Sequence, residues 1–302
     1  MPETPLTIPA LDGFPLAARL LTPEGAPKAV VQVNGGTAIR KEFYGSFARF
    51  LVEHGYAVCI WDFRGTGESA PASLRGFQAR CLDWGTLDMP AVLDFLSERF
   101  PALPLLFMGH SAGGQQVGFM PNYQKVRGMV CFATSSGYWG FMPPGYRFRT
   151  VHFYFHLLVP VMTALRGYAA TGWTGAIDDL PAGVARDWRD WCSRPDYFFD
   201  EKFFGKTVPR GHFDALSFPI KVYWATDDPI SNARAVPAFW QHVHSKKYLE
   251  IEALRPAEHG LKSIGHFGFF RKMARETLWR KALEDLEEMR LGEGNDDNDS
   301  PP

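Results

Sequence analysis

Residues 105–114 read LLFMGHSAGG, an apolar run that leads directly into a glycine-flanked serine, Ser111. The apolar run predicts a buried strand, and the small residues after Ser111 predict a sharp turn into a helix. A serine at such a corner exposes its hydroxyl, and Gly109 and Gly113 leave room for the crowded backbone. A glycine-rich turn with an idle serine has the same pattern, so a catalytic interpretation depends on partners elsewhere in the chain.

Apolar runs and helical stretches alternate on both sides of this segment. Two alternating segments between residues 6 and 21 flank Asp12-Gly13, a turn signal typical of an antiparallel hairpin. Further strands are expected at residues 29–33, 57–61, 105–108, 128–134, 219–224 and 247–253, and helices near 43–54, 87–99, 232–241 and 269–290, with another beginning near 112. Such alternation is typical of a parallel sheet covered on both faces. The predicted fold class is α/β, a mostly parallel doubly wound sheet with an N-terminal antiparallel hairpin.

The alternation stops between residues 137 and 216, which we interpret as an inserted helical cap. Helices are expected within it at residues 151–165 and 184–191, while residues 1–136 and 217–291 form the core. Residues 292–302 are polar and acidic, which predicts a disordered tail. The cap also holds 18 of the 44 Trp, Tyr and Phe residues, so its aromatic content is well above that of the core.

The overall charge is balanced, with 32 Lys and Arg against 33 Asp and Glu. The composition as a whole therefore gives no electrostatic footprint for nucleic acid or anionic membranes. The N-terminal ten residues lack the basic and apolar regions of a signal peptide, and the apolar stretch 151–165 is too short and too interrupted to cross a bilayer. These features predict a cytoplasmic protein without a membrane span and leave its oligomeric state open.

The four cysteines are widely separated, and no histidine lies at metal-ligand spacing from them. We expect no disulfide framework and no metal site, and we expect reduced, buried thiols. The residues concerned are Cys59, Cys81, Cys131 and Cys192.

A serine nucleophile needs a base and an orienting carboxylate, and both have candidates later in the chain. Asp227 and Asp228 follow the strand expected at 219–224, at the edge of an α/β sheet where sites form. We favour Asp228, with Asp227 as its rival. His266 follows the last expected strand and is the favoured base, with His259 of the same loop as its rival.

Two backbone amides are candidates to stabilise an oxyanion. The first is that of Ala112, at the start of the helix after Ser111. The second comes from the glycine loop after the strand at 29–33, where Gly36 is the expected donor. His110 adjoins the serine but should point away from its hydroxyl, so we assign it no chemistry.

Taken together, these motifs resemble the α/β-hydrolase family from about residue 6 to residue 286. The segment DFRGTGES at 62–69 is similar to a turn of monoglyceride-lipase-like and prolyl-iminopeptidase-like members, where it is a scaffold. The segments at 83–85, 109–115 and 265–271 resemble a bacterial group of predicted hydrolases whose substrate is uncertain. One departure is Asn34, which replaces the histidine that often precedes the oxyanion loop and leaves the second donor less certain.

The resemblance implies a serine hydrolase that cleaves a carboxylic ester, thioester or lactone through an acyl-enzyme, without cofactor or metal. Ser111 would be the nucleophile, His266 the base and Asp228 the acid. The same triad serves amidases, aminopeptidases and acyltransferases, and a non-catalytic binding protein on this scaffold is a weaker alternative.

The cap is the expected source of substrate contacts. Tyr138, Trp139 and Phe141 directly follow a strand end, so we expect them near the substrate, which would be an apolar small molecule. An aminopeptidase would instead need carboxylates to hold an ammonium group. The acidic residues of the cap that could serve are Asp178, Asp179, Asp187, Asp190, Asp196 and Asp200.

Overall fold

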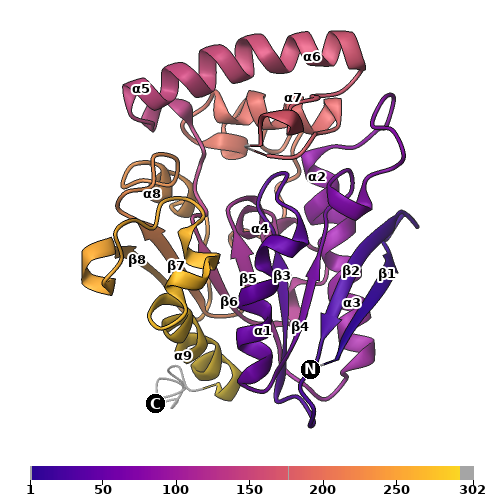
Figure 1. Ribbon diagram of the computed structural model, residues 1–302, viewed down its shortest axis with the longest axis vertical. Coiled ribbons are helices and arrows are strands. Elements are labelled where there is room, and N and C mark those ends of the chain that lie inside the picture. The colour runs from indigo at the N-terminus through magenta and orange to yellow at the C-terminus, as the bar shows by residue number, and fades with distance from the viewer. Residues whose placement is uncertain (1, 176, 293–302) are drawn as a thin grey trace, which may run out of the picture.

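The computed structural model describes residues 2–175 and 177–292, and in this part of the chain eight strands form one sheet (Figure 1). Their order is β1-β2-β4-β3-β5-β6-β7-β8. The strands are β1 (Glu3–Pro9), β2 (Pro15–Leu21), β3 (Ala29–Asn34), β4 (Tyr56–Trp61), β5 (Leu105–His110), β6 (Val126–Phe132), β7 (Ile220–Ala225) and β8 (Leu249–Leu254). The pairs β1–β2 and β2–β4 are antiparallel and the others are parallel. The predicted fold class is confirmed.

Helices cover both faces of the sheet because successive strand residues point to opposite sides. On β3, Val31 and Val33 belong to the core that includes α1 (Gly45–Glu53) and α9 (Leu278–Leu291). Val30 belongs to the opposite core, together with residues of α3 (Met89–Arg99) and α8 (Ala235–Trp240). The chain leaves β3 toward β4 on one side and returns to β5 on the other, which makes a switch point between β3 and β5.

The terminal helix differs in extent from the sequence prediction, and the helix after Ser111 begins where it was predicted but is short. The terminal helix begins at Leu278, not near residue 269, because Arg271 has an extended backbone between two single helical turns. The helix after Ser111, α4 (Ala112–Gln115), ends after four residues. Gly118 lies just beyond it, and a side chain there would collide with Phe213.

The segment 137–216, which we call the insert, adds no strand to the sheet within the described residues. Its helical parts include α5 (Pro144–Arg147), the wider π-type turns Phe148–Leu158, α6 (Val159–Arg166) and α7 (Ala182–Cys192), so both helices predicted there are confirmed. In Figure 1, α5, α6 and α7 lie as a layer above the sheet edge where β5 and β6 end. Among the described helices, none combines the length and apolar character needed to cross a bilayer. Apart from Gly292, the predicted tail at 292–302 lies outside the described residues.

Ion pairs and buried polar contacts tie the segments around the site together. Arg80 binds both carboxylate oxygens of Asp187 at 2.7 Å, which joins the residue before α2 (Cys81–Asp83) to α7. In the 62–69 segment, the buried Lys41 ammonium contacts Asp62 at 2.7 Å and Glu68 at 2.6 Å. This segment connects loops, as expected for a scaffold.

Candidate active site

Ser111 lies at a strained corner between β5 and α4. Its backbone has φ 50° and ψ −115°, a region that non-glycine residues rarely adopt, and its N–H donates to the carbonyl of Phe132 at 2.9 Å. A Cβ atom on Gly113 would lie 2.0 Å from the carbonyl oxygen of Asn34. Only glycine fits there, which explains why the sequence surrounds Ser111 with glycines.

His266 and Asp228 come together beside this corner. The Nδ1 atom of His266 lies 2.7 Å from Oδ2 of Asp228, whose other oxygen accepts the Ile230 N–H at 2.7 Å. Asp228 is 3% exposed, so its carboxylate is held by these contacts and shielded from water. The arrangement fixes the proton of His266 on Nδ1 and leaves Nε2 as its acceptor.

Asp227, the rival acid, has a different position. Its carboxylate accepts hydrogen bonds from the Ser263 hydroxyl at 2.8 Å, the Ile264 N–H at 3.0 Å and the Gly265 N–H at 2.9 Å. Burial alone would raise the pKa of Asp227, but these donors outweigh it and lower the pKa. Asp227 thus fastens the loop that carries His266, while Asp228 contacts the imidazole.

A cavity of about 350 Å³ contains both Ser111 and His266 in its lining. No hydrogen bond joins the Ser111 hydroxyl to His266 within the described residues, a looseness common in substrate-free sites. Phe155, Leu158, Ile177 and other apolar side chains of the insert form much of the wall, and no Asp or Glu belongs to the described lining. His259, the rival base, is also outside the described lining.

The aromatic residues expected to contact substrate lie beside the cavity and not in its described lining. Tyr138, Trp139 and Phe141 do not belong to the described cavity lining, although Gly137 and Met142 on either side of them do. Tyr138 and Phe141 pack edge to face, with ring centroids 4.8 Å apart. Trp139 packs against Phe155 and His156. Tyr138 and Phe141 thus pack against each other across the turn at 139–141, while Trp139 packs against the helical segment Phe148–Leu158.

Gly36, the expected second oxyanion donor, lines the cavity, but its amide already has a hydrogen-bond partner. The Gly36 N–H donates to the hydroxyl of Tyr44 at 2.8 Å, in buried surroundings. Thr37, the next residue, lines the cavity, and its N–H has no hydrogen-bond partner among the described residues. The amide of Ala112, as the first residue of α4, has no intrahelical acceptor and stays available.

A buried relay that the sequence did not reveal joins the Gly36 loop to the His266 loop. His110 Nε2 lies 2.9 Å from the carbonyl oxygen of His266, which can only accept, so Nε2 carries the proton. The Tyr44 hydroxyl therefore donates to His110 Nδ1, 2.8 Å away, while accepting from Gly36. Burial, with a smaller effect of His266, lowers the pKa of His110 to about 3, so the ring stays neutral.

The role of His110 is therefore positional, which agrees with the expectation that it points away from Ser111. The sequence signal for such a role is a histidine at the end of a buried strand, where an imidazole requires partners. Tyr44 has no comparable signal, since it lies at a helix start far away in sequence.

The acidic residues of the insert are engaged outside the cavity. Asp178 binds Arg40 at 2.7 Å, and Asp187 binds Arg80. The others have these contacts: Asp179 with the Gly172 N–H, Asp190 with Arg189, Asp196 with His242, and Asp200 with the Lys202 N–H.

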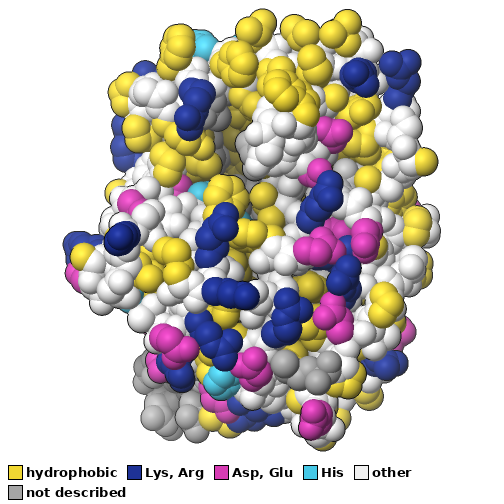
Figure 2. Space-filling model, viewed as in Figure 1, with side chains coloured by type: hydrophobic (Ala, Val, Ile, Leu, Met, Phe, Trp, Pro, Cys, Tyr) yellow, Lys and Arg dark blue, Asp and Glu magenta, His cyan; other side chains and the backbone are white. Residues whose placement is uncertain are grey.

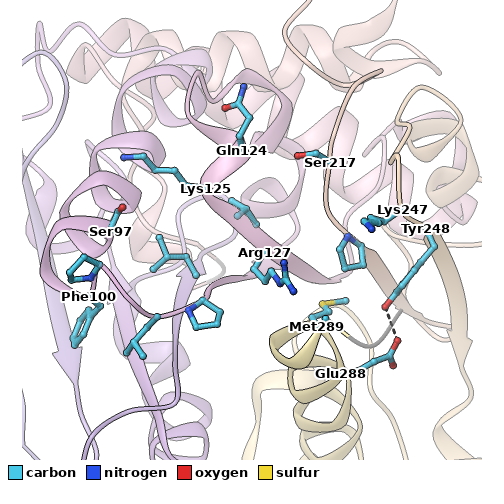
Figure 3. Close-up of a pocket in the computed structure, with 17 residues that line it drawn as sticks. Ser97, Phe100, Gln124, Lys125, Arg127, Ser217, Lys247, Tyr248, Glu288 and Met289 are labelled. Atoms are coloured by element: carbon cyan, nitrogen blue, oxygen red, sulfur yellow. Dashed lines mark hydrogen bonds between the residues drawn. The ribbon is translucent and has the colours of Figure 1, made fainter. Parts of the chain in front are cut away.

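A second cavity, of about 440 Å³, lies at the other edge of the sheet (Figure 3). Its lining includes Leu105 and Val126, the first residues of β5 and β6, and its Tyr248 hydroxyl donates to Glu288 at 3.0 Å. Ligands of α/β sheets bind beyond the carboxyl ends of strands, where Ser111 lies. The second cavity is therefore not the candidate active site.

Comparison with known proteins agrees with this geometry. A family model described as serine aminopeptidase, S33, matches residues 25–172 and supports a hydrolase. No match was found among curated proteins.

Solved structures with the same fold cover almost the whole chain. A soluble variant of monoglyceride lipase from Saccharomyces cerevisiae is 14% identical, covers 95% of each chain and has a TM-score of 0.65. An esterase from Exiguobacterium antarcticum is 16% identical over 94% of this chain and 100% of its own, with a TM-score of 0.60. A serine hydrolase without lid from Xanthomonas campestris is 15% identical over 94% and 96%, with a TM-score of 0.54. By its strand order, its strained serine corner and these matches, the chain is a member of the α/β-hydrolase fold.

Proposed function

We propose that the protein is a cytoplasmic serine hydrolase that cleaves carboxylic esters, thioesters or lactones of apolar small molecules through an acyl-enzyme. The observation that carries the proposal is the 2.7 Å contact between His266 Nδ1 and the buried Asp228, at the wall of the cavity that holds Ser111. A base oriented by a carboxylate beside a strained serine is the arrangement that activates a hydroxyl for acyl transfer.

In this mechanism the Ser111 hydroxyl attacks the acyl carbon while His266 Nε2 takes its proton. Asp228 holds the imidazole tautomer and stabilises the imidazolium that forms. His266 then gives the proton to the leaving alcohol or thiol, and water, activated by the same imidazole, releases the acyl group from Ser111. Each of the two half-reactions, acylation and deacylation, returns His266 to its neutral state.

The oxyanion of the tetrahedral intermediate needs two donors, and we assign them to the amides of Ala112 and Thr37. Both Gly36 and Thr37 line the cavity, but the Gly36 N–H is already bonded to Tyr44, whereas the Thr37 N–H is unpaired within the described residues. Each such donor contributes roughly 100- to 1,000-fold in kcat.

The cavity supports an apolar substrate. Its wall combines Phe155, Leu158 and Ile177 of the insert with the polar corner at Ser111, and the described lining has no carboxylate. We therefore propose that the insert acts as a cap over the site. Similar structures include a monoglyceride lipase bound to a substrate analogue and several esterases, which fits this substrate class.

The description of the family match favours a second candidate, an aminopeptidase. That activity needs an acidic group to hold the substrate ammonium, and all six candidate aspartates of the insert have other contacts and lie outside the described lining. Inhibition of ester turnover by amino-acid amides would favour the aminopeptidase, and its absence supports the esterase.

Replacing Ser111 with alanine tests the proposal. Ser111→Ala should abolish labelling by a fluorophosphonate probe and lower the hydrolysis of short-chain nitrophenyl esters by roughly 1,000-fold or more. Ser97→Ala is the matched control, because Ser97 lines the second cavity and should leave both readouts unchanged. Persistence of labelling or turnover in Ser111→Ala would exclude Ser111 as the nucleophile.

A further inference from the structure

The outer face of the insert exposes a continuous apolar stripe. Ten large hydrophobic side chains are exposed in the described residues, and six of them lie between positions 148 and 173. They are Phe148, Phe153, Leu157, Val161, Leu165 and Trp173, each between 43% and 74% exposed. Hydrophobic side chains crowd the upper end of the molecule over the insert in Figure 2. We call these six residues the apolar stripe.

Figure 1 shows α5, Phe148–Leu158 and α6 as a single helical rod, and all stripe residues but Trp173 belong to it. The first five members of the stripe are spaced four or five residues apart, about one helical turn. The opposite side of the rod is buried through Val151, Phe155 and Val159, which pack toward the rest of the protein. The rod thus has its own core contacts, and the stripe is not needed to hold the rod in place.

The segment that carries the stripe has only basic charged residues, although the whole chain is nearly neutral. Residues 99–177 contain no Asp or Glu, whereas Arg147, Arg149 and Arg166 lie at the two ends of the rod. Arg75 joins them, because its guanidinium donates to the carbonyls of Leu165 and Arg166. An exposed apolar face flanked by arginines is typical of a helix that lies in the plane of an anionic lipid surface.

We propose that the insert docks the protein on an anionic lipid surface through the apolar stripe and the arginines beside it. A second copy of the chain fits less well, since its stripe is equally basic and the two faces would repel each other. The rod lies on the surface and does not enter the hydrocarbon core as a span, since no described helix meets the requirements for crossing.

The stripe is also continuous with the candidate active site. Phe153 belongs to the stripe and lines the cavity, and Arg149 lines the cavity beside it. Docking would therefore bring the cavity wall to the lipid surface, where apolar esters accumulate. This last consequence rests on the proposed function, whereas docking itself does not.

The test is sedimentation of the full-length protein with phosphatidylcholine vesicles, with and without phosphatidylglycerol. The wild-type protein should bind the anionic vesicles, and the triple variant Phe148→Ser, Leu157→Ser, Leu165→Ser should bind them roughly tenfold or more weakly. All three positions are exposed and outside the described cavity lining, so thermal unfolding and turnover of a soluble ester without vesicles should not change. Leu11→Ser combined with Met273→Ser is the matched control, because both residues are exposed on the core.

A second variant separates charge from apolar contact. Arg147→Gln combined with Arg166→Gln should weaken binding to anionic vesicles by about fivefold per arginine and leave binding to neutral vesicles unchanged.

Failure of the wild type to bind anionic vesicles, or equal binding by the triple serine variant, would overturn the proposal. A wild-type dimer that the triple variant abolishes, without vesicle binding, would assign the stripe to a second copy. Absence of ester turnover in the wild type and in all variants would refute the proposed function and would leave the docking proposal unaffected.

Discussion

The carboxyl edge of the sheet and the insert above it differ in how closely sequence determines the position of a side chain. At the sheet edge, Ser111, Asp228 and His266 each follow a strand, Ser111 and His266 line one cavity, and Asp228 contacts His266 from behind it. In the insert, Tyr138 and Phe141 pack against each other and Trp139 packs against Phe155, while other side chains line the cavity.

The difference has a geometric cause. The parallel register places the ends of neighbouring strands together, with Asn34 opposite Gly109 and Gly109 opposite Cys131. A residue just after a strand is therefore confined to a small volume. A helix in the insert can rotate about its axis or shift along it, and each choice presents different side chains to the cavity.

At the sheet edge, the largest loss of kcat is expected when the charge of Asp228 is removed, and Asp227 is the matched comparison. Asp228→Asn should lower kcat by roughly 1,000- to 10,000-fold, because an amide cannot hold the imidazole in the same tautomer or stabilise its charge. Asp227→Asn should lower kcat only about tenfold or less, since it loosens the 263–265 loop and leaves the contact of His266 intact. Steady-state kinetics on a nitrophenyl ester measure both, and a reversed order of effects would exchange the two assignments.

The sequence thus predicted the fold class and placed Asp228 where it contacts His266, but it could not show which backbone amides already have a hydrogen-bond partner. Gly36 has the right place in the sequence for an oxyanion donor, but Tyr44, which enters from another element, takes its N–H. No local pattern marks Tyr44 as that partner. The exact start of α9 was missed for a similar reason, because buried packing of Phe269 and Phe270 holds the chain in separate turns.

The next test concerns the buried imidazole of His110 and the dependence of stability on pH. In the unfolded chain His110 takes up a proton near pH 6.5, but in the folded protein burial lowers its pKa to about 3. Unfolding therefore binds a proton between these values, so stability falls as the pH falls from about 6.5 toward 3, by up to about 1.4 kcal/mol per pH unit. Above pH 6.5 both states are neutral and the effect vanishes.

His110→Asn removes this titration while keeping a polar group on the strand end. Urea unfolding of the variant between pH 6.5 and 4.5 should show a shallower loss of stability than the wild type. Parallel losses in the two proteins would mean that His110 is protonated in the folded state and that the relay through Tyr44 is arranged differently.

In the insert, we compare the effects on KM of substitutions at side chains that line the cavity and at an aromatic residue beside it. Ile177→Ala and Phe155→Leu should raise KM for a medium-chain ester by about five- to tenfold, because each removes apolar surface from the substrate contact. Phe141→Leu should change KM by less than about twofold, since Phe141 packs against Tyr138 and the Arg234 guanidinium. Equal effects of the three substitutions on a series of acyl lengths would show that the insert moves when substrate binds.

The smallest expected effect tests how the insert is attached to the core. Asp178, next to the cavity-lining Ile177, binds Arg40 through both carboxylate oxygens at 2.7 and 2.8 Å, but Arg40 is 63% exposed. Asp178→Asn should therefore lower the free energy of unfolding by only about 0.2–1 kcal/mol, and added salt should reduce the difference. Asp190→Asn is the control, because Asp190 pairs with Arg189 inside α7 and joins no second region. If the two variants lose the same stability but only Asp178→Asn raises KM, this ion pair positions the cavity wall more than it holds the fold. If neither changes KM, the hydrogen bond from the Asp178 N–H to Ala38 and the apolar contacts of the insert suffice to hold the wall in place.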